Sequence, residues 1–448
     1  MSIKKKKKQR ELARRIRLYL ASALLFCNAG AALAAPLNVA LPEGGSFVFG
    51  GINGNIIADR DTGRMFVTQD GTNAVIRWNG FSIGGNAIVN FNKNGGGPFN
   101  VLNYVNYGGP MSEIYGTINA NDGSVFLVNP AGVTFGKSAQ INVGSLYVSN
   151  QILGEPDLRG FNGNADTLKN SGTIGAGELM NLGYINAAKG QVTFVGDRIV
   201  LDADRIRDTK GQQLSADKII VQTKGGNTDN LTIGYSAFDK ENGTYAGKNT
   251  TESIAKVNGA DYTKQQGYMW VDNVQQLQAM NTNTGGNYAL HNSIGAVETA
   301  NWDANKGFAP VANFAGKFDG LGYSVFDLTI DRPTENNVGL FADANGATIK
   351  NIYMVGGAVK GQNNVGAIVG EATGTTIGGI ATSINVTGNS NVGGVAGATK
   401  NSNLIDVMNT GGVTGPGTGN NNIGGIVGQM NGGQLRGHNS SEQSFVNR

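Results

Sequence analysis

Short apolar runs separated by Gly and Asn fill the chain from about residue 50 onward. Between residues 50 and 150 the runs are brief, as at 125–128, 133–135 and 146–148. Between them stand residues that tolerate a positive φ or preset a bend, as in the turns 129–132 and 136–138. Strands set this closely do not fit a sandwich of long hairpins. The pattern predicts an all-β solenoid, a parallel β-helix in which coils stack and Asn side chains form ladders.

The same pattern continues from residue 170 to residue 223, with more charge between the strands. We interpret the charged residues of this block as a solvated outer face; they are Asp202, Asp204, Arg205 and Arg207. Residues 239–267 are polar and short of apolar side chains, so they predict a linker or an excursion from the solenoid.

Residues 272–280 predict the one short helix. Asp272 can cap it, Gln275 has capping-box spacing, and apolar side chains recur on one face. We expect this helix to pack on the solenoid.

The last third of the chain is an internal repeat. The segments 337–341, 364–370, 391–397 and 422–428 share an Asn-Val/Ile-Gly start, and they begin 27, 27 and 31 residues apart. Such a period predicts an array in which each unit buries its apolar strip against its neighbours. The chain stops at Arg448 without an obvious cap, so we expect it to be part of something longer.

Composition supports a repetitive β fold. The 70 Gly among 448 residues are more than twice the usual share, which is about 7%. Collagen would need Gly at every third position and abundant Pro, whereas the chain has only 9 Pro. Disorder is disfavoured because apolar runs recur throughout.

The first 34 residues predict a secretory signal peptide. A positive stretch precedes an apolar run at 18–27, and small residues follow. The triplet Ala32-Leu33-Ala34 predicts cleavage after residue 34. A membrane anchor is disfavoured because the run is shorter than the roughly 20 residues that span a bilayer.

Removal of this segment changes the charge of the chain. Residues 1–34 hold nine of the 35 basic residues and one of the 32 acidic ones, so the rest has 26 against 31 and a net charge of −5. This balance gives no electrostatic case for nucleic-acid binding. The only cysteine, Cys27, leaves with the segment, as suits a protein without disulfides that crosses a narrow pore unfolded.

Candidate chemistry is sparse. Residues 132–138 resemble a phosphate-binding loop, but Ala131 stands where the first Gly is needed and a strand follows instead of a helix. His291 and His438 lie far apart without cysteines, so they predict neither a zinc site nor a catalytic triad, and we expect both at the surface.

A polysaccharide lyase or glycosidase is the main enzymatic alternative. Strand alternation would place Asp202 and Asp204 on one face, but the same placement suits a solvated rim. The sequence therefore predicts no catalytic residue, no cofactor and no metal, and a protein that is not an enzyme.

Four motifs within residues 54–153 resemble the amino-terminal secretion domain of filamentous haemagglutinin, haemolysin-type exoproteins and contact-dependent-inhibition proteins. The motifs are RWNGFSIG at 77–84, SEIYGTINA at 112–120, VFLVNPAGVTFG at 125–136 and AQINVGSL at 139–146. The family's Asn-Pro-Asn-Gly turn appears as Asn129-Pro130-Ala131-Gly132. The departure at Ala131 leaves the turn shape intact and puts a role for the second Asn side chain in doubt. The residues to which we assign the secretion motif are Trp78, Asn79, Gly80, Ser112, Glu113, Gly116, Asn129, Pro130 and Gly132.

A second resemblance covers residues 268–433. The helix segment at 274–281, the segments 307–310 and 318–323, and the repeats are similar to the Gly-Leu-Ungapped-Gly (GLUG) modules of large surface adhesins.

Together the two resemblances imply a division of labour in an exported protein. The amino-terminal secretion domain would be recognised by the POTRA domains of an outer-membrane β-barrel transporter. It would emerge as the first coils of a right-handed parallel β-helix. An exposed strand edge can pair with a partner's strand, and each coil formed outside templates the next. The implied location is the medium or the cell surface, outside the outer membrane, reached through the periplasm.

The predicted domain order follows. It is a signal peptide at 1–34, a two-partner secretion domain at 35–155, continuing β-helix at 156–238, a polar linker or excursion at 239–267 and GLUG-like repeats at 268–448. The implied role is adhesion of the filamentous haemagglutinin type, with a receptor that no residue pattern identifies. A toxin-delivery stalk that lacks its effector is an alternative. An autotransporter is disfavoured because no closing barrel, with its alternating strands, is seen before Arg448.

Overall fold

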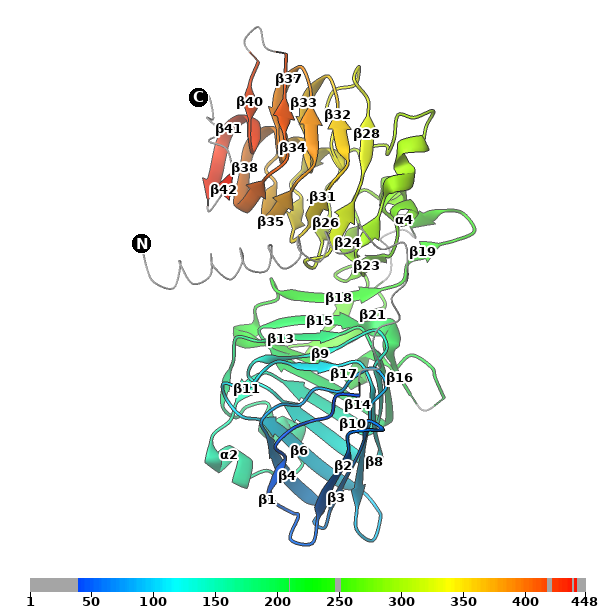
Figure 1. The fold of residues 1–448 in the computed structure, drawn as a ribbon, viewed down its shortest axis with the longest axis vertical. Helices are drawn as coiled ribbons and strands as arrows, with labels where there is room; N and C mark the ends of the chain where they lie inside the picture. The colour runs from blue at the N-terminus through cyan, green and yellow to red at the C-terminus, as the bar shows by residue number, and fades with distance from the viewer. Residues whose placement is uncertain (1–38, 209, 246–250, 417–420, 437–438, 441–448) are drawn as a thin grey trace.

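The chain folds into a parallel β-helix whose front coils stack upward in the view of Figure 1 and whose rear coils stack across the top of that view. We call the coils up to residue 290 the front coils and those from residue 294 onward the rear coils. The computed structural model describes residues 39–208, 210–245, 251–416, 421–436 and 439–440. The predicted signal peptide and His438 lie outside the described residues. The predicted all-β solenoid is confirmed, because nearly all strand pairs between successive coils are parallel.

One wall of the front coils is a single mixed sheet. Its strands are β1 (Ser46–Phe49), β2 (Asn55–Asp59), β3 (Arg64–Gln69), β4 (Asn73–Trp78), β5 (Ile88–Lys93), β6 (Phe99–Val105), β8 (Thr117–Val128), β10 (Gln140–Ser149), β14 (Tyr184–Gly196), β16 (Ile206–Arg207), β17 (Ile219–Thr223), β21 (Ser253–Val257) and β22 (Ala260–Thr263). The pairing of the long strands β8, β10 and β14 shifts register between Val143 and Ser145 of β10. Such an irregularity bends each strand partway along its length.

A second wall continues from the front coils into the rear coils. Its front strands are β7 (Ser112–Ile114), β9 (Gly132–Phe135), β13 (Glu178–Asn181), β15 (Arg198–Asp202), β18 (Leu231–Tyr235), β23 (Tyr268–Val271) and β24 (Asn287–Leu290). Its rear strands are β25 (Ile294–Gly295), β26 (Lys317–Asp319), β27 (Ser324–Phe326), β29 (Phe341–Asn345), β30 (Thr348–Lys350), β31 (Tyr353–Val355), β34 (Val369–Thr373), β35 (Thr376–Thr382), β38 (Ala396–Asn409), β41 (Val427–Arg436) and β42 (Asn439–Ser440).

Two smaller parallel sheets complete the rear coils. One contains β28 (Thr329–Asp331), β32 (Ala358–Lys360), β36 (Asn385–Thr387) and β39 (Val413–Thr414), and the other contains β33 (Asn363–Gly366), β37 (Ser390–Gly393) and β40 (Ile423–Gly424). The register equates Val338, Val365, Val392 and Ile423, so the predicted repeat is one coil of the helix.

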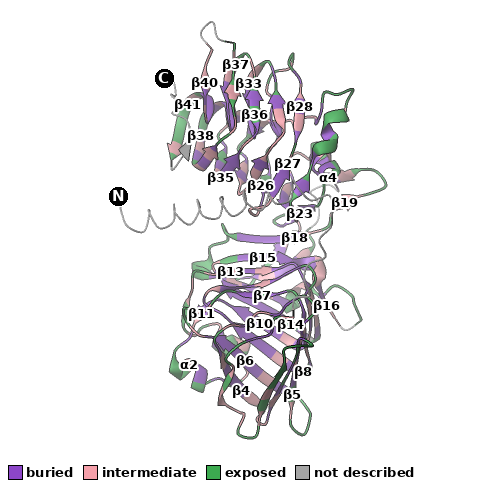
Figure 2. Ribbon diagram, viewed as in Figure 1, coloured by how far each residue is buried: buried purple, intermediate pink, exposed green. Residues whose placement is uncertain are grey.

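Alternation along the strands builds the core. In β3 the side chains of Met65 and Val67 point inward and are buried, while Arg64 and Phe66 point outward. Figure 2 shows the same contrast between buried strands and exposed loops along the stack. The buried side chains form one large cluster in the front coils and another in the rear coils, and Tyr235 packs against both.

An excursion between β10 and β13 covers part of the outer surface. It contains the small sheet of β11 (Gln151–Ile152) and β12 (Thr173–Ile174) and the helices α2 (Glu155–Arg159) and α3 (Ala165–Leu168), which the sequence analysis did not predict. Leu158, Phe161 and Leu168 from this excursion pack over outward-facing apolar side chains of the front strands. Gln151 anchors it, since its Nε2 donates to the carbonyl oxygens of Leu168 and Ser171 at 3.0 and 2.6 Å.

Two other predicted segments differ in detail. The predicted helix is α4 (Val274–Ala279), and its cap is Asn273, one residue later than predicted, because the Asn273 side chain accepts the backbone N–H of Gln276. Of the two predicted alternatives for residues 239–267, a linker or an excursion, the described residues 239–245 and 251–267 have the second, with two hairpins. These are β19 (Phe238–Asp239) with β20 (Thr244–Tyr245), and β21 with β22. Their few apolar residues suffice because the hairpins turn Tyr245, Ile254 and Tyr262 inward.

Candidate functional site on the front coils

The turn after β8 is held by one buried side chain. Asn129 is fully buried, and its Nδ2 donates to the carbonyl oxygen of Pro110 and to Ser112 Oγ, both at 2.9 Å. Its Oδ1 accepts the backbone N–H of Ala131 at 2.9 Å, which is an Asx turn. The turn therefore forms with Ala131 in place of the family's second Asn, because it uses only the backbone of that residue.

Pro130 and Gly132 fit the remaining demands of this turn. Pro130 presets φ at the second position, and the Gly132 N–H closes the turn on the Asn129 carbonyl oxygen at 2.9 Å. Gly132 has φ +107°, and a Cβ there would lie 2.5 Å from the carbonyl oxygen of Glu178 on the next coil. Only glycine meets both conditions without displacing that coil.

Ser112 and Glu113 share strand β7, but they face opposite ways. Ser112 is buried against Asn129, whereas the Glu113 side chain is exposed. The backbone of β7 pairs with β9 in parallel register. At the following corner a Cβ on Gly116 would lie 2.3 Å from the carbonyl oxygens of Gly84 and Ala87, so a larger residue would separate two coils.

Trp78, Asn79 and Gly80 form the neighbouring corner one coil earlier. The Trp78 indole is buried, donates from Nε1 to Asn103 Oδ1 at 3.0 Å and packs edge-on against Phe81. Asn79 and Gly80 exchange backbone hydrogen bonds with Glu43, which covers the first coil. A Cβ on Gly80 would meet only Pro110, at 3.5 Å, so no close contact requires glycine there.

The nine predicted residues therefore lie on adjacent corners of the front coils; Gly80 and Asn129 both contact Pro110, and Gly116 lies at the corner with Gly84 and Ala87. Most of them, including Trp78, Ser112 and Asn129, build the backbone of these corners. Glu113 and Asn79 present exposed side chains.

The sequence analysis missed an exposed apolar patch beside the first coil. Ile57 of β2 and Phe66 of β3 are directly paired and are 57% and 44% exposed, and Ile52 nearby is 95% exposed. Among the described strands β2 pairs only with β3, so its outer edge is open. The exposure of Phe66 could have been inferred from the sequence, because it lies between Met65 and Val67, which face inward on the same strand.

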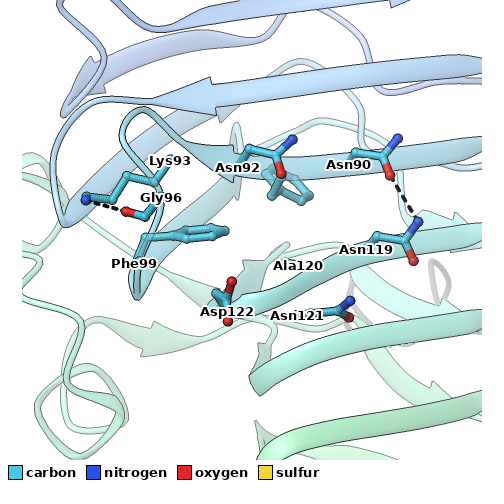
Figure 3. A pocket seen from close by; sticks show the side chains of 11 residues that line it. Asn90, Asn92, Lys93, Gly96, Phe99, Asn119, Ala120, Asn121 and Asp122 are labelled. Carbon is cyan, nitrogen blue, oxygen red and sulfur yellow. Dashed lines mark hydrogen bonds between the residues drawn. The ribbon is translucent and has the colours of Figure 1, made fainter.

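An open depression of about 510 Å³ lies where β5 and β8 separate (Figure 3). Its rim carries Asn92, Asn121 and Asp122, and one side holds a hydrogen bond of 3.0 Å from Asn119 Nδ2 to Asn90 Oδ1. The depression exists because the loop that carries Lys93 and Gly96 leaves the sheet before the chain returns at Phe99. It is a polar surface notch without convergent reactive groups.

The prediction of a solvated outer face for the charged block is wrong for Asp202, whereas Asp204, Arg205 and Arg207 are half-exposed. Asp202 is only 2% exposed, and its Oδ2 lies 3.1 Å from Arg205 Nε. Asp204 does not follow it in alternation, because a 3-10 turn, η1 (Ala203–Arg205), begins there. Burial raises the pKa of Asp204, while the backbone N–H of Ser236 donates to it and opposes that rise.

His291 is also misplaced by the sequence analysis, which put it at the surface. It is 7% exposed, and it contacts the carboxylates of Asp202 and Asp272. The sequence could not predict this cluster, because residues 202, 272 and 291 are far apart in the chain and come together only through the stacking of coils.

The described part of the chain holds no group of three or more His, Cys, Asp or Glu side chains arranged to bind a metal. Residues 132–138 run through β9 into the turn before β10, so a strand follows the loop, as the sequence predicted. Within the described residues no helix is long and apolar enough to cross a membrane.

Comparison with known proteins places these coils in a family. The family model described as the TPS secretion domain matches residues 53–307, well past the domain boundary predicted at residue 155. The heme/hemopexin-binding protein of Haemophilus influenzae is 34% identical over 171 residues, which are 37% of this chain and 18% of that protein. Halomucin of Haloquadratum walsbyi is 34% identical over 165 residues, 34% of this chain and 2% of that protein. The chain thus corresponds to a small part of both relatives.

The crystal structure of the HMW1 secretion domain from Haemophilus influenzae aligns with 84% of this chain and 91% of that chain, at 14% identity and a TM-score of 0.30. The family model alone covers more than half of the sequence. The chain therefore belongs to the TPS secretion domain family, the exoproteins of two-partner secretion, which are secreted across the outer membrane to the cell surface or the medium.

Proposed function

We propose that the front coils address a partner transporter in the outer membrane through the corners that carry the secretion motif. The observation that carries this proposal is that all nine residues of the secretion motif fall inside the family match at 53–307 and lie on adjacent corners of the front coils, two of which contact Pro110. We assign two roles within the group. Asn129, Ser112 and Gly132 build the turn, and Glu113 presents a charged side chain that a partner can reach.

Export in the presence of the transporter tests this proposal. The full chain is expressed with and without the adjacent transporter gene, and the protein in the medium and on the cell surface is quantified. We expect export only with the transporter, and loss of export on deletion of residues 112–146. Equal export of that deletion would contradict the assignment of the front coils.

Glu113→Gln separates recognition from folding. The Glu113 side chain is exposed, so its replacement should leave stability within about 0.5 kcal/mol of the parent while export falls several-fold. Asp61→Asn is the matched control, since Asp61 is an exposed acidic residue of the same coils. Unchanged export of Glu113→Gln would move the recognised group elsewhere on the front coils.

For the rear coils we propose an adhesive role of the GLUG type. The regular stack of coils from residue 337 onward supports it, because a repeated coil extends a surface outward without adding new chemistry. Cells that display the chain should adhere to a host-cell layer more than cells that express the transporter alone. Equal adherence of the two would contradict adhesion.

A further inference from the structure

His291 lies at the junction of the front and rear coils, which we define as strands β18, β23 and β24. Strands β15 and β18 pair over four residues, but β18 and β23 pair over only two, Gly234 with Tyr268 and Tyr235 with Met269. The backbone ladder is thus thin where the two cores meet. His291 follows β24 directly, and its backbone N–H donates to the Val271 carbonyl oxygen at 3.0 Å.

Two carboxylates from different coils approach opposite nitrogens of this imidazole. His291 Nδ1 lies 2.8 Å from Asp272 Oδ1, and Nε2 lies 3.3 Å from Asp202 Oδ2. The second contact is an ion-pair distance rather than an aligned hydrogen bond, because Nε2 has no aligned hydrogen-bond partner. Asp202 ends β15, which β18 and β23 separate from β24 in the sheet. The imidazole therefore connects coils that are not neighbours.

Only the protonated ring suits both contacts. Neutral imidazole has one N–H and one lone pair, so either tautomer turns a lone pair toward a carboxylate. Imidazolium has two N–H groups and a positive charge. The Trp270 ring stacks on the imidazole with centroids 4.5 Å apart and an angle of 15°, a contact that also favours a cation.

We propose that protonated His291 is a pH-sensitive clasp that holds the front and rear coils together at their junction. The proposal goes beyond export and does not depend on how the chain is recognised. The charged and titratable groups around the imidazole are Asp202 at the end of β15, Asp204 and Arg205 on η1, Asp272 between β23 and α4, and Lys137 before β10.

The balance of these groups sets the direction of the switch. Burial acts to lower the pKa of His291, but the nearby carboxylates of Asp202 and Asp272 outweigh burial and raise it above the ordinary value, against the opposing charge of Lys137. The hydrogen bond from His291 holds the pKa of Asp272 below its ordinary value. The contribution of His291 to the free energy of unfolding is complete below the pKa that it has in the unfolded chain. This contribution is lost as the pH rises through the pKa that it has in the folded protein. The contribution of Asp272 is lost only when acid protonates it.

A titration of the full chain tests the clasp directly. The sequence has only two histidines, so isotope-labelled imidazole carbons give two resonances, which His438→Gln assigns. We expect His291 to titrate above the ordinary histidine pKa and to fall toward it in Asp202→Asn. Titration at or below the ordinary value would overturn the proposal.

Hydrogen exchange then tests whether protonation holds the junction. Protection factors of the Tyr268 and Met269 amides, corrected for intrinsic exchange, should fall about tenfold per pH unit between the unfolded and folded pKa of His291. His291→Gln should remove this slope while amides of β8 and β10 keep their protection. If His291→Gln does not fold, Lys137→Gln decides, since it should move the slope to higher pH. A parent protein without a one-proton slope would overturn the clasp.

Discussion

Asparagine ladders occur in both the front and the rear coils, but they are built differently. In the front coils Asn90, Asn119, Asn142 and Asn186 lie in extended strands, and their carboxamides join at 3.0, 2.9 and 2.7 Å. In the rear coils Asn337, Asn364, Asn391 and Asn422 join at 2.8, 2.7 and 2.7 Å, and the first three have φ between 52° and 55°.

The repeat motif of the rear coils explains this difference. In the last three motifs another Gly stands four residues after the first one, and a Cβ on Gly370, Gly397 or Gly428 would lie within 2.4 Å of the backbone of the ladder Asn one coil earlier. The later glycine of a rear coil thus packs directly against the backbone of an Asn with positive φ in the preceding coil. The front coils have no such fixed motif, and excursions such as residues 150–177 take up their unequal lengths.

Similar Asn ladders can therefore arise in two ways. One is a short motif that recurs in every coil, and the other is the register of long strands that pair between coils. The rear coils encode their register in each repeat. The front coils depend on long paired strands, of which β14 has 13 residues, and on large buried side chains such as Trp78. The following substitutions separate the two modes.

Gly397→Val should have the largest effect. Its side chain would enter the backbone of Asn364 and Val365, which cannot move without separating two coils, at a cost of about 3 kcal/mol or more. Hydrogen exchange resolved by peptide should show lost protection in the rear coils and retained protection in β8 and β10. The control is Gly378→Ala, where a Cβ meets only the Ile405 carbonyl oxygen at 3.5 Å. Equal loss in both variants would contradict the close-contact argument.

Trp78→Phe should come next and should act on the front coils. It removes the indole N–H that Asn103 Oδ1 accepts and leaves a small cavity, so we expect a loss of about 2–3 kcal/mol. Urea unfolding followed through front-coil amides measures it. A loss confined to the rear coils would be inconsistent with separate cores.

Asn364→Ala and Asn119→Ala compare the two ladders directly. Both remove two ladder hydrogen bonds, but only Asn364 has a positive φ, which Ala adopts poorly. We expect losses of about 2 kcal/mol for Asn364→Ala and about 1 kcal/mol for Asn119→Ala in chemical denaturation. Asn364→Gly should fall between them, since it keeps the backbone conformation. Equal losses at both sites would remove the distinction between the ladders.

Lys137→Gln should have the smallest effect and the opposite sign. Removing this cation relieves its repulsion of protonated His291 and raises the pKa of His291 further, so the junction should gain up to about 0.5 kcal/mol near pH 5, where His291 is protonated, and nothing near pH 9, where it is neutral. Thermal unfolding at the two pH values measures the gain. A gain near pH 9 alone would contradict the predicted direction.

Much of the fold was predictable because its signals are local. The short strand β9 and the turn at Asn129-Pro130 depend on neighbours in the chain, and the sequence identified them. The repeat of the rear coils was predictable because every coil repeats the same contacts. The helix cap was misplaced by one residue because Asp272 and Asn273 can both cap, and the contact of Asp272 with His291 leaves Asn273 to do so.

The sequence by itself determined that the chain is an all-β stack of coils, where one rear coil ends and the next begins, and which residues form the corner turns. Only the tertiary structure decided that Asp202 and His291 are buried, that α2 and α3 cover an apolar strip, and that four irregularly spaced asparagines form the front ladder. The reason is physical: these features depend on which coils lie beside one another across 20 to 90 residues of chain, and excursions of unequal length set that register.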